Sequence, residues 1–213
     1  MSDCCNAAAY RDLFDEKQAR RDLRRYDKKG LDDLGRSIVA YLSSRGLSGR
    51  TVLEVGGGIG AMQAELLLAG ADSATNVELS GEYEETARAL LDRTGTRDRV
   101  ERRIGDFTEL AGELEGDDVV LHRVICCYPF MDRLMEAAMS SSKRFIAATF
   151  PRDRFGVKAV IALENTWHKI RGVDFRGYVH DPEEIVETAR SGGFEVVFQE
   201  RDFSWHATVF ERL

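Results

Sequence analysis

A run of glycines directly follows a short apolar segment in the first half of the chain. The segment 51–55 (Thr-Val-Leu-Glu-Val) has the composition of a buried strand and leads into Gly56-Gly57-Gly58-Ile59-Gly60. Because glycine lacks a Cβ and accepts positive φ, such a turn lets the backbone approach a nucleotide closely. The spacing fits two patterns, GxGxxG/A through Ala61 and an acidic residue followed by GxGxG through Glu54. The turn therefore predicts a nucleotide-type cofactor without choosing between a dinucleotide and a cationic nucleoside.

Acidic residues at the ends of the expected strands favour the cationic cofactor. Glu54 would be a buried carboxylate beside the glycines, where it would repel a pyrophosphate but suits a sulfonium and an ammonium. Glu78 ends the next expected strand, where an acid can accept hydrogen bonds from both ribose hydroxyls, as it also does in NAD enzymes. Asp106 and Phe107 follow the third strand. There Asp106 would accept a hydrogen bond from the adenine amino group, and Phe107 would pack against the ring. Taken alone, Asp106 is more typical of a turn. The ordered set predicts S-adenosylmethionine (SAM) as the cofactor and S-adenosylhomocysteine (SAH) as its product.

The cofactor and acceptor ends of the expected site draw on different residues. The predicted cofactor-binding set is Glu54, Gly56, Gly57, Gly58, Gly60, Glu78, Leu79, Asp106, Phe107 and His122. Methyl transfer is an in-line displacement that depends on alignment and exclusion of water, and a base helps only if the acceptor holds a proton. The candidates for such a base are Tyr26, His122, Cys127, Tyr128 and His180. His122 could equally be a packed core histidine and Cys127 a small apolar residue. We select Tyr26 and Cys127 as catalytic-site residues that line the acceptor pocket.

The elements that must position these residues alternate between strand and helix. Strands are expected at 51–55, 74–79, 100–104, 118–127, 144–150, 194–199 and 203–210. Helices are expected at 10–30, 31–46, 61–68, from a Ser80 cap to Leu91, at 131–139, at 157–170 and from Pro182 onward. The last two strands are too close in sequence to pair other than antiparallel. The pattern predicts an α/β protein with a Rossmann-like, seven-stranded, mostly parallel sheet, an antiparallel C-terminal strand pair and helices on both faces.

Two segments lie outside this alternation. The first helix is dense in charge and thinly amphipathic, which favours a helical lid over residues 1–48 that covers a SAM-binding domain at 49–213. The segment 151–179 carries Phe155, Trp167, Phe175 and Tyr178. These aromatic residues could form the wall of an apolar pocket, ordinary core or a dimer contact.

Composition narrows the class of substrate. A net charge of -7 over 213 residues argues against a general nucleic-acid binder, and Cys126-Cys127-Tyr128-Pro129 is not the Asn/Asp-Pro-Pro-Tyr/Phe motif of base-amine methylation. There is no apolar run of the roughly 20 residues that a membrane span needs, and no signal-peptide pattern. We expect a cytoplasmic protein that acts on a small-molecule substrate, with no nucleic-acid partner and no membrane span. Homodimer formation stays open.

The four cysteines form two adjacent pairs, Cys4-Cys5 and Cys126-Cys127. Neither pair has CxxC spacing or a His/Cys cluster beside it, so no metal site is expected. Vicinal disulfides are strained, which favours free thiols in a reducing compartment. A metalloid acceptor held by these pairs would be a narrow variant of methyl transfer.

Over residues 48–213 the chain resembles the class I SAM methyltransferases, through the glycine loop, Glu78, Gly105-Asp106 and the final hairpin. It also resembles, more weakly, magnesium-protoporphyrin O-methyltransferases and their small bacterial relatives. Leu13-Phe14, Arg24-Arg25-Tyr26 and Cys127-Tyr128-Pro129 carry this second likeness. It implies an N-terminal lid whose tyrosine, matching Tyr26, takes part in the reaction. That family has His where this chain has Cys127, so the likeness does not extend the porphyrin substrate to this chain.

Three hypotheses about function follow. The first is a SAM-dependent methyltransferase that acts on a small molecule, with O-methylation favoured. The second is a nucleotide-dependent oxidoreductase of Rossmann type, which the glycine loop alone would also fit. The third is a SAM-binding protein without catalysis.

Overall fold

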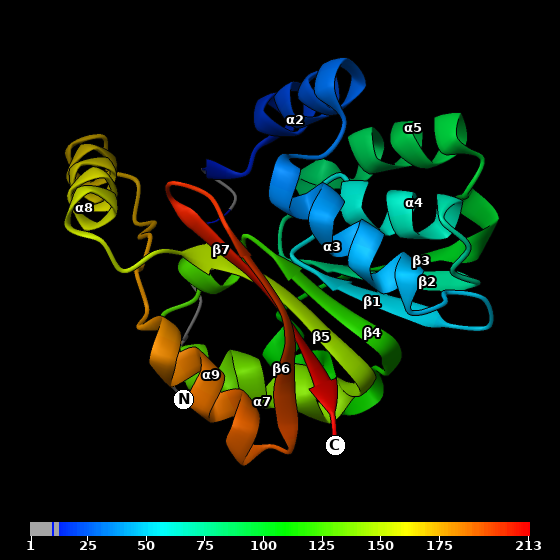
Figure 1. Ribbon diagram of the computed structural model, residues 1–213. Coiled ribbons are helices and arrows are strands. Elements are labelled where there is room, and N and C mark those ends of the chain that lie inside the picture. Colours follow the sequence, from blue (N-terminus) through cyan, green and yellow to red (C-terminus); the bar gives the residue numbers. More distant parts are fainter. Residues whose placement is uncertain (1–9, 11–12) are drawn as a thin grey trace.

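The computed structural model describes Tyr10 and residues 13–213, so the Cys4-Cys5 pair lies outside the described residues. Its centre is a seven-stranded sheet in the order β3-β2-β1-β4-β5-β7-β6 (Figure 1). The strands are β1 (Thr51–Val55), β2 (Ser73–Glu78), β3 (Val100–Ile104), β4 (Gly116–His122), β5 (Ser142–Pro151), β6 (Phe194–Arg201) and β7 (Trp205–Arg212). β1 to β5 are parallel, whereas β7 runs antiparallel to both β5 and β6. The predicted fold class is confirmed.

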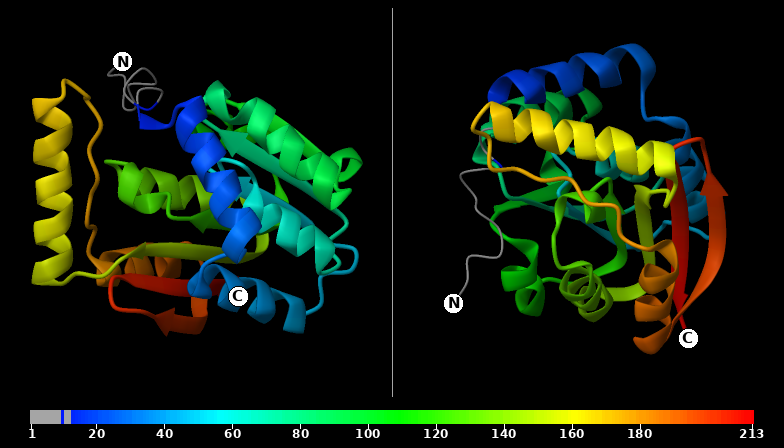
Figure 2. Two further views of the ribbon diagram at one scale, coloured as in Figure 1. Left: turned by 90° about the horizontal axis from the view of Figure 1, so that it is seen from above. Right: turned by 90° about the vertical axis from the view of Figure 1, so that its left-hand side faces the viewer.

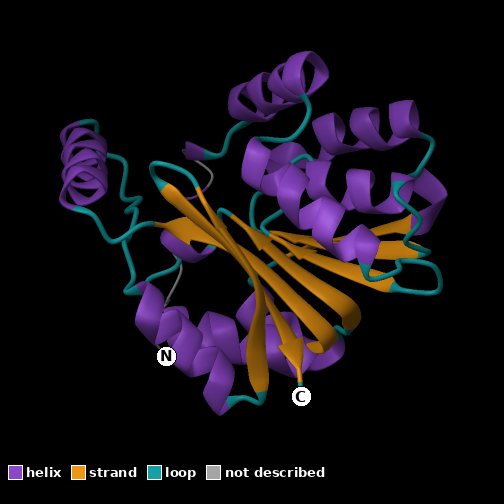
Figure 3. Ribbon diagram, viewed as in Figure 1, coloured by secondary structure: helices purple, strands orange, loops and turns teal. Residues whose placement is uncertain are grey.

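Helices cover both faces of this sheet, as the purple layers on either side of the orange strands show (Figure 3). One layer contains α3 (Asp33–Ser44), α4 (Ala61–Leu68) and α5 (Glu84–Thr94), and the other contains α6 (Phe107–Leu110), α7 (Met131–Ser141) and α9 (Pro182–Ser191). The central strands β1, β4 and β5 are buried almost without interruption, because both of their faces are covered. The edge strand β6 is mostly exposed or half-buried. α2 (Glu16–Lys29) packs on α5 rather than on the sheet.

Aspartates begin several of these helices. The side chains of Asp15, Asp32 and Asp181 accept hydrogen bonds from backbone N–H groups in the first turns of α2, α3 and α9. An aspartate at this position satisfies a donor that has no partner within the helix. Asp181 followed by Pro182 is the predicted start of α9. The helix predicted over 10–30 is interrupted: Phe14 and Asp15 are not helical, and α2 begins at Glu16 with Asp15 as its cap.

The structure corrects two further predictions. The strand predicted over 118–127 ends at His122, because Arg123 turns the chain with a φ of 61° and the apolar run continues as the 3₁₀ turn η4 (Ile125–Cys127). Ser80 does not cap the next helix with its side chain. Its hydroxyl instead donates to the carbonyl of Phe14 at 2.7 Å, and the 3₁₀ turn η1 (Gly81–Tyr83) precedes α5.

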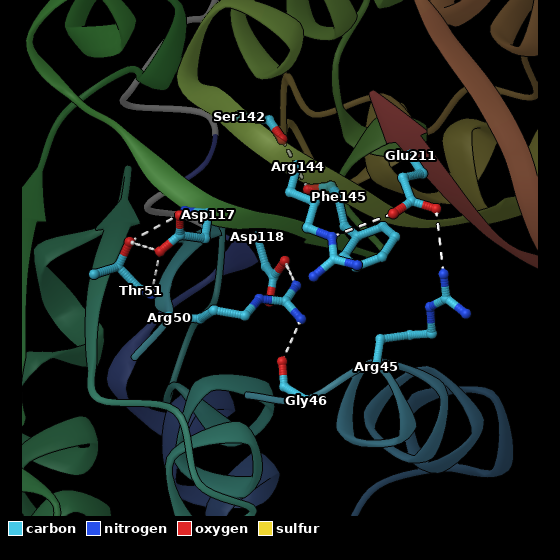
Figure 4. Close-up of polar contacts among 10 residues, drawn as sticks. All are labelled: Arg45, Gly46, Arg50, Thr51, Asp117, Asp118, Ser142, Arg144, Phe145 and Glu211. Carbon is cyan, nitrogen blue, oxygen red and sulfur yellow. Dashed lines mark hydrogen bonds and ion pairs between the residues drawn. The ribbon is translucent and has the colours of Figure 1, made fainter. Parts of the chain in front are cut away.

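A buried ion pair holds the amino-terminal end of the sheet, at the opposite end from the glycine loop (Figure 4). Arg50, just before β1, pairs with Asp118 of β4, and its guanidinium lies 4.9 Å from the ring centroid of Phe145. Arg50 also donates to the carbonyl of Gly46 at 2.6 Å. A buried charge is tolerated when it is paired and hydrogen-bonded in this way. The pair joins the start of β1 to β4 and so helps to fix the register of the central strands.

The helix α8 (Phe155–Ile170) stands at one side of the molecule and follows β5 (Figures 1 and 2). Of its residues only Val157 is buried, and Phe155 is 89% exposed. Ordinary core is therefore the wrong description for Phe155 and for Trp167, which is also exposed, whereas Phe175 is buried. No helix among the described residues is long and apolar enough to cross a bilayer.

Candidate functional site

A cavity of about 390 Å³ opens at the carboxyl ends of β1, β2 and β4. It contains nearly all of the residues predicted to bind the cofactor, namely Glu54, Gly56, Gly57, Gly58, Glu78, Leu79, Asp106, Phe107 and His122. Tyr26 and Cys127 also line it. Gly60 does not, because it precedes the first residue of α4 with a φ of 79°. No residue of the segment 151–179 lines this cavity.

Glu54 lies directly beneath the glycine loop. The Glu54 side chain is buried, and its Oε2 accepts the Gln63 N–H at 3.1 Å and the Asn76 side-chain N–H at 3.2 Å. Burial raises the pKa of Glu54 to about 7, although these hydrogen bonds and the charge of Arg102 oppose the shift. A Cβ added to Gly57 would lie 2.5 Å from Glu54 Cδ. Only glycine fits at that position, so the loop lies directly on the carboxylate.

Glu78 holds the other side of the loop. Its Oε2 accepts the Gly58 N–H at 2.8 Å and its Oε1 accepts the Ser80 N–H at 3.0 Å. The side chain is almost fully buried, and burial raises its pKa above the ordinary value. A carboxylate offers about four lone-pair sites, so two remain for hydroxyl donors that enter the cavity. The carboxylate thus fits a ribose diol.

Asp106 and Phe107 form the wall next to Glu78. Asp106 caps α6, because its Oδ1 accepts the Thr108 N–H at 2.9 Å. Tyr128 contacts the same corner, with its hydroxyl 2.8 Å from Thr108 Oγ1 and 3.4 Å from Asp106 Oδ2. Phe107 is buried but still lines the cavity. A carboxylate beside an aromatic ring fits a heteroaromatic ring that carries an amino donor.

The helix α2 covers the cavity from the side, and three polar contacts attach it to the helical layer. Tyr26 donates to Glu65 of α4 at 2.8 Å, Tyr83 donates to Asp22 at 3.0 Å, and Arg93 of α5 donates to Asp27 at 2.9 Å. Residues of this N-terminal region line the cavity: Tyr10, Phe14, Gln18, Asp22, Arg25, Tyr26, Gly30, Leu31 and Asp32. Arg25 has no ion-pair or hydrogen-bond partner among the described residues. Its guanidinium is an exposed cation at the cavity, unpaired within the part of the chain that the structure describes.

The two residues selected as catalytic have hydroxyl and thiol groups that stay protonated. Burial and the carboxylate of Glu65 raise the pKa of Tyr26 well above its ordinary value. The hydrogen bond with Cys126 and burial raise the pKa of Cys127, whose Sγ lies 3.6 Å from Cys126 Sγ. Both residues line the cavity. Because their pKa values are raised, neither group is ionised near neutral pH, so neither can act as a general base there.

A charged cluster that the sequence did not reveal lies at the end of β4. Asp32 Oδ2 lies 2.6 Å from Arg123 Nη2 and 3.4 Å from His122 Nε2, and all three residues line the cavity. Burial alone would raise the pKa of Asp32. The hydrogen bond of His122, the N–H of Gly35 and the charge of Arg123 outweigh it and hold that pKa well below its ordinary value. The position of Asp32 before a helix could predict a helix cap. Nothing in the sequence predicts its contact with the residues after β4.

Both ring nitrogens of His122 are engaged. Thr149 Oγ1 lies 3.1 Å from His122 Nδ1 and also accepts the Arg123 N–H at 2.8 Å. Since that hydroxyl accepts from the backbone, its own hydrogen is available to Nδ1, which places the imidazole hydrogen on Nε2, toward Asp32. In this arrangement His122 helps to position Asp32, and neither of its ring nitrogens has a free lone pair to accept a proton from a substrate.

Of the remaining candidate bases, Tyr128 lines the cavity, whereas His180 supports the turn after β4. His180 Nε2 lies 2.8 Å from the Tyr128 carbonyl, and Tyr178 donates its backbone N–H to the Cys126 carbonyl at 2.7 Å. His180 and Tyr178 also stack on each other, with ring centroids 5.7 Å apart. They brace the turn after β4. Within the described part of the chain, no group of three His, Cys, Asp or Glu residues could hold a metal ion.

Comparison with solved structures identifies the same arrangement of elements. Magnesium protoporphyrin IX methyltransferase from Synechocystis PCC 6803 with bound SAH is 19% identical, covers 98% of this chain and 100% of that chain, and has a TM-score of 0.76. The same enzyme with bound SAM is 17% identical, with full coverage of both chains and a TM-score of 0.74. An O-methyltransferase family protein from Burkholderia thailandensis is 17% identical, with 94% of this chain and 63% of that chain covered and a TM-score of 0.67. At these identities the likeness shows the fold, which is that of the SAM-dependent methyltransferases. No protein-family model and no curated protein matches the chain in sequence.

Proposed function

We propose that this chain is a SAM-dependent methyltransferase that methylates an oxygen of a small molecule. The observation that carries the proposal is the buried Glu78 carboxylate, which holds the Gly58 N–H and faces the same cavity as Asp106 and Phe107. These groups suit the ribose and adenine of an adenosine, and the space above Gly57 and Gly58 suits a close approach of the ligand to the backbone. When bound, SAM would supply a methyl carbon activated by the sulfonium.

The carboxylate of Glu54 supports the cationic cofactor over a dinucleotide. It lies directly beneath the glycine loop, where its negative charge would oppose a pyrophosphate. The sheet that includes the antiparallel β7 next to β5 belongs to a fold shared with a methyltransferase at a TM-score of 0.76. The oxidoreductase hypothesis therefore gains no support from the site.

The groups around the acceptor end favour an acceptor oxygen that enters already ionised, such as a carboxylate or an acidic phenol. Tyr26 and Cys127 stay protonated, Asp32 is held by Arg123, and both nitrogens of His122 are engaged. Arg25 offers an exposed positive charge at the cavity for an anionic molecule. We propose that these residues bind, orient and exclude water, while none of them removes a proton from the acceptor.

The N-terminal region supports a lid, which we propose for the segment up to Gly30. α2 contacts the helical layer through three side-chain hydrogen bonds and a small apolar cluster that Ala19 and Leu23 join, and its residues form one side of the cavity. The lid was predicted over residues 1–48; since α3 packs against β6 and β7, we limit the proposed lid to the segment before α3. The SAM-binding domain over 49–213 remains part of the proposal.

Titration calorimetry with SAM, SAH and NAD(H) tests the cofactor. We expect binding of SAM and SAH and none of NAD(H), and failure of folded protein to bind either SAM species would overturn the proposal. A transfer assay with methyl-labelled SAM over carboxylic acids, porphyrins and phenols then tests the acceptor. Turnover confined to acceptors that are ionised at the assay pH supports the ionised oxygen, whereas turnover of unactivated alcohols contradicts it.

A further inference from the structure

The outward face of α8 carries a continuous apolar stripe. Phe155, Leu163, Trp167 and Ile170 are 89%, 72%, 56% and 72% exposed, and Val160 is exposed between them. Residues 160, 163, 167 and 170 alternate in steps of three and four, so they share one side of the helix. Phe203, in the turn between β6 and β7, is also exposed and lies under Arg154, directly before α8. The stripe therefore continues onto the neighbouring hairpin.

The opposite side of α8 is the one that attaches to the protein. Val157 is buried, Asn165 exchanges two hydrogen bonds of 2.8 Å with the backbone of Gly177, and the ring of His168 lies 5.8 Å from that of Phe175. Phe175 in turn contacts the rings of Tyr10 and Phe14, which line the cavity. α8 therefore packs on the protein through its other side, and the apolar stripe faces outward. Aromatic contacts connect α8 to residues that line the cavity.

A second surface, on α2, is strongly cationic. Its exposed cations are Lys17, Arg21, Arg24, Arg25, Lys28 and Lys29, and none of them has an ion-pair partner among the described residues. The acidic residues of the helix are engaged elsewhere: Glu16 pairs with Arg20, Asp22 accepts from Tyr83, and Asp27 pairs with Arg93. This surface occurs on a protein whose net charge is -7. Such a concentration of free cations attracts an anionic surface that the protein as a whole would repel.

The two helices lie along neighbouring edges of the molecule, with α8 at the left and α2 at the top of Figure 1. In the right-hand view of Figure 2, which faces the α8 side, α8 lies in front and α2 lies behind it along the top. The left-hand view shows α8 as the outermost element, beyond the ends of the strands. Lys169 and Arg171 at the end of α8 add two cations beside the stripe. Apolar residues with Trp and Phe, flanked by Lys and Arg, are the composition of a helix that lies in a membrane interface.

We propose that the outer faces of α8 and α2 form a docking surface for an anionic phospholipid bilayer. The stripe of α8 would enter the interface between headgroups and acyl chains, and the cations of α2 would lie against acidic headgroups. Charge complementarity favours this occupant over a second copy of the chain, because a second copy would bring another cationic α2 and a like net charge. The proposal does not depend on methyl transfer, since Arg25 is the one residue of the docking surface, as described, that also lines the cavity.

Co-sedimentation with vesicles tests the proposal on the full-length chain. We expect binding to vesicles of equimolar phosphatidylcholine and phosphatidylserine, little binding to phosphatidylcholine alone, and release as the salt concentration rises. Trp167 is exposed whereas Trp205 is half-buried, so the tryptophan emission should shift to shorter wavelength when vesicles bind. Equal binding to neutral and anionic vesicles, or no binding to either, would overturn the proposal.

Matched variants separate the two parts of the surface. Leu163→Ser with Trp167→Ser should weaken vesicle binding at least tenfold, whereas Leu68→Ser with Val197→Ser, two exposed apolar residues elsewhere, should not. Arg21→Glu with Arg24→Glu should weaken it more than tenfold, at roughly fivefold for each cation lost. Lys143→Glu with Arg190→Glu makes the same change in net charge away from α2 and should have a much smaller effect. Thermal unfolding of each variant confirms that it folds.

Oligomeric state and cofactor binding complete the experiment. If the wild-type chain is a dimer by light scattering, becomes monomeric with Leu163→Ser and Trp167→Ser, and ignores vesicles, then a second copy covers α8 and the proposal is wrong. If both the α8 and the α2 variants bind vesicles like the wild type, it is also wrong. SAM affinity should be unchanged in the α8 variant, so failure of docking and failure of the proposed function give different results.

Discussion

Asp32 and Arg123 form an ion pair of 2.6 Å that joins the start of α3 to the turn after β4. Arg123 also stacks its guanidinium over Trp205 of β7, 4.7 Å from the ring centroid. Its backbone has a positive φ, a conformation that costs a non-glycine residue of order 1 kcal/mol and persists only when neighbours enforce it. The aspartate therefore helps to hold a strained residue in the wall of the cavity.

The low pKa of Asp32 predicts a stability that depends on pH. Because the folded pKa lies below the unfolded value near 4, the ionised carboxylate stabilises the fold above about pH 4, and this contribution is lost as the pH falls further. Asp32→Asn should lower the free energy of unfolding at pH 7 by about 1–2 kcal/mol, allowing for partial exposure. Urea unfolding of both proteins between pH 3 and pH 7 measures this. A difference that does not shrink toward acid pH would contradict it.

Glu54 predicts pH dependence in another range and with the opposite sign. Its pKa of about 7 lies above the unfolded value, so the carboxyl is protonated in the folded protein at acid pH and its ionisation costs stability as the pH rises from about 4 through 7. A cationic cofactor favours the ionised form, so SAM should bind more tightly at pH 8 than at pH 6 and should release a proton on binding. Calorimetry in buffers of different ionisation enthalpy measures the release. Glu54→Gln should abolish it, and SAH, which lacks the sulfonium charge, should show less of it.

Glu78→Ala should weaken SAM binding roughly 100-fold, or about 3 kcal/mol, because two hydrogen bonds to a buried carboxylate are lost. The substitution also frees the N–H groups of Gly58 and Ser80, so some loss of thermal stability is expected. Titration of SAM into the variant measures the affinity. Glu82→Ala, an exposed acid close by in η1, is the control and should bind like the wild type. Unchanged affinity of Glu78→Ala would show that this carboxylate does not serve the cofactor.

Gly57→Ala should disturb the glycine loop, because the added Cβ would collide with Glu54 and Asn76. Since both partners are buried, we expect a loss of about 1–3 kcal/mol in stability and a marked loss of SAM affinity. Gly112→Ala is the matched control, as a Cβ there meets nothing within 4 Å. Thermal unfolding and cofactor titration of the two variants measure the difference. Equal behaviour would mean that the loop can move away from Glu54.

Tyr26→Phe should retain most of the turnover. The hydroxyl donates to Glu65 and its pKa is raised, so it attaches α2 and does not act as a base. We expect kcat to fall less than tenfold and the acceptor KM to rise through a looser lid. Steady-state kinetics with an acceptor found in the transfer assay measures both. A loss of kcat near a thousandfold would instead assign the hydroxyl to the reaction.

The sequence predicted the sheet and the cofactor end of the site because both depend on local signals. Buried parallel strands are continuous apolar runs, and Glu54 and Glu78 stand at the ends of two such strands. Asp106 follows β3, a mostly exposed edge strand, and was found from its place in the order of elements. The predicted strand 118–127 ran past the observed end of β4 because the apolar run continues beyond Arg123. The sequence does not show that Arg123 adopts a positive φ.

The acceptor end could not be predicted, since its contacts are tertiary. Asp32 meets Arg123 and Tyr26 meets Glu65 across distant parts of the chain, and these contacts decide which groups can titrate. The period of α8 predicted a helix, but periodicity does not say whether an apolar face has a partner within the chain. That question required the structure, which leaves the stripe around Leu163 exposed.

The polar contacts of α2 have a consequence for the order of folding. Tyr26, Asp22 and Asp27 bind partners 39, 61 and 66 positions later in the chain. The helix leaves the ribosome before α4 and α5, and it can dock only after both of them have been made. At roughly 5–20 residues per second this delay lasts seconds. The side of the cavity that α2 forms is thus assembled after the half of the sheet that carries the glycine loop. We therefore expect α2 to be the element that opens first in native-state hydrogen exchange.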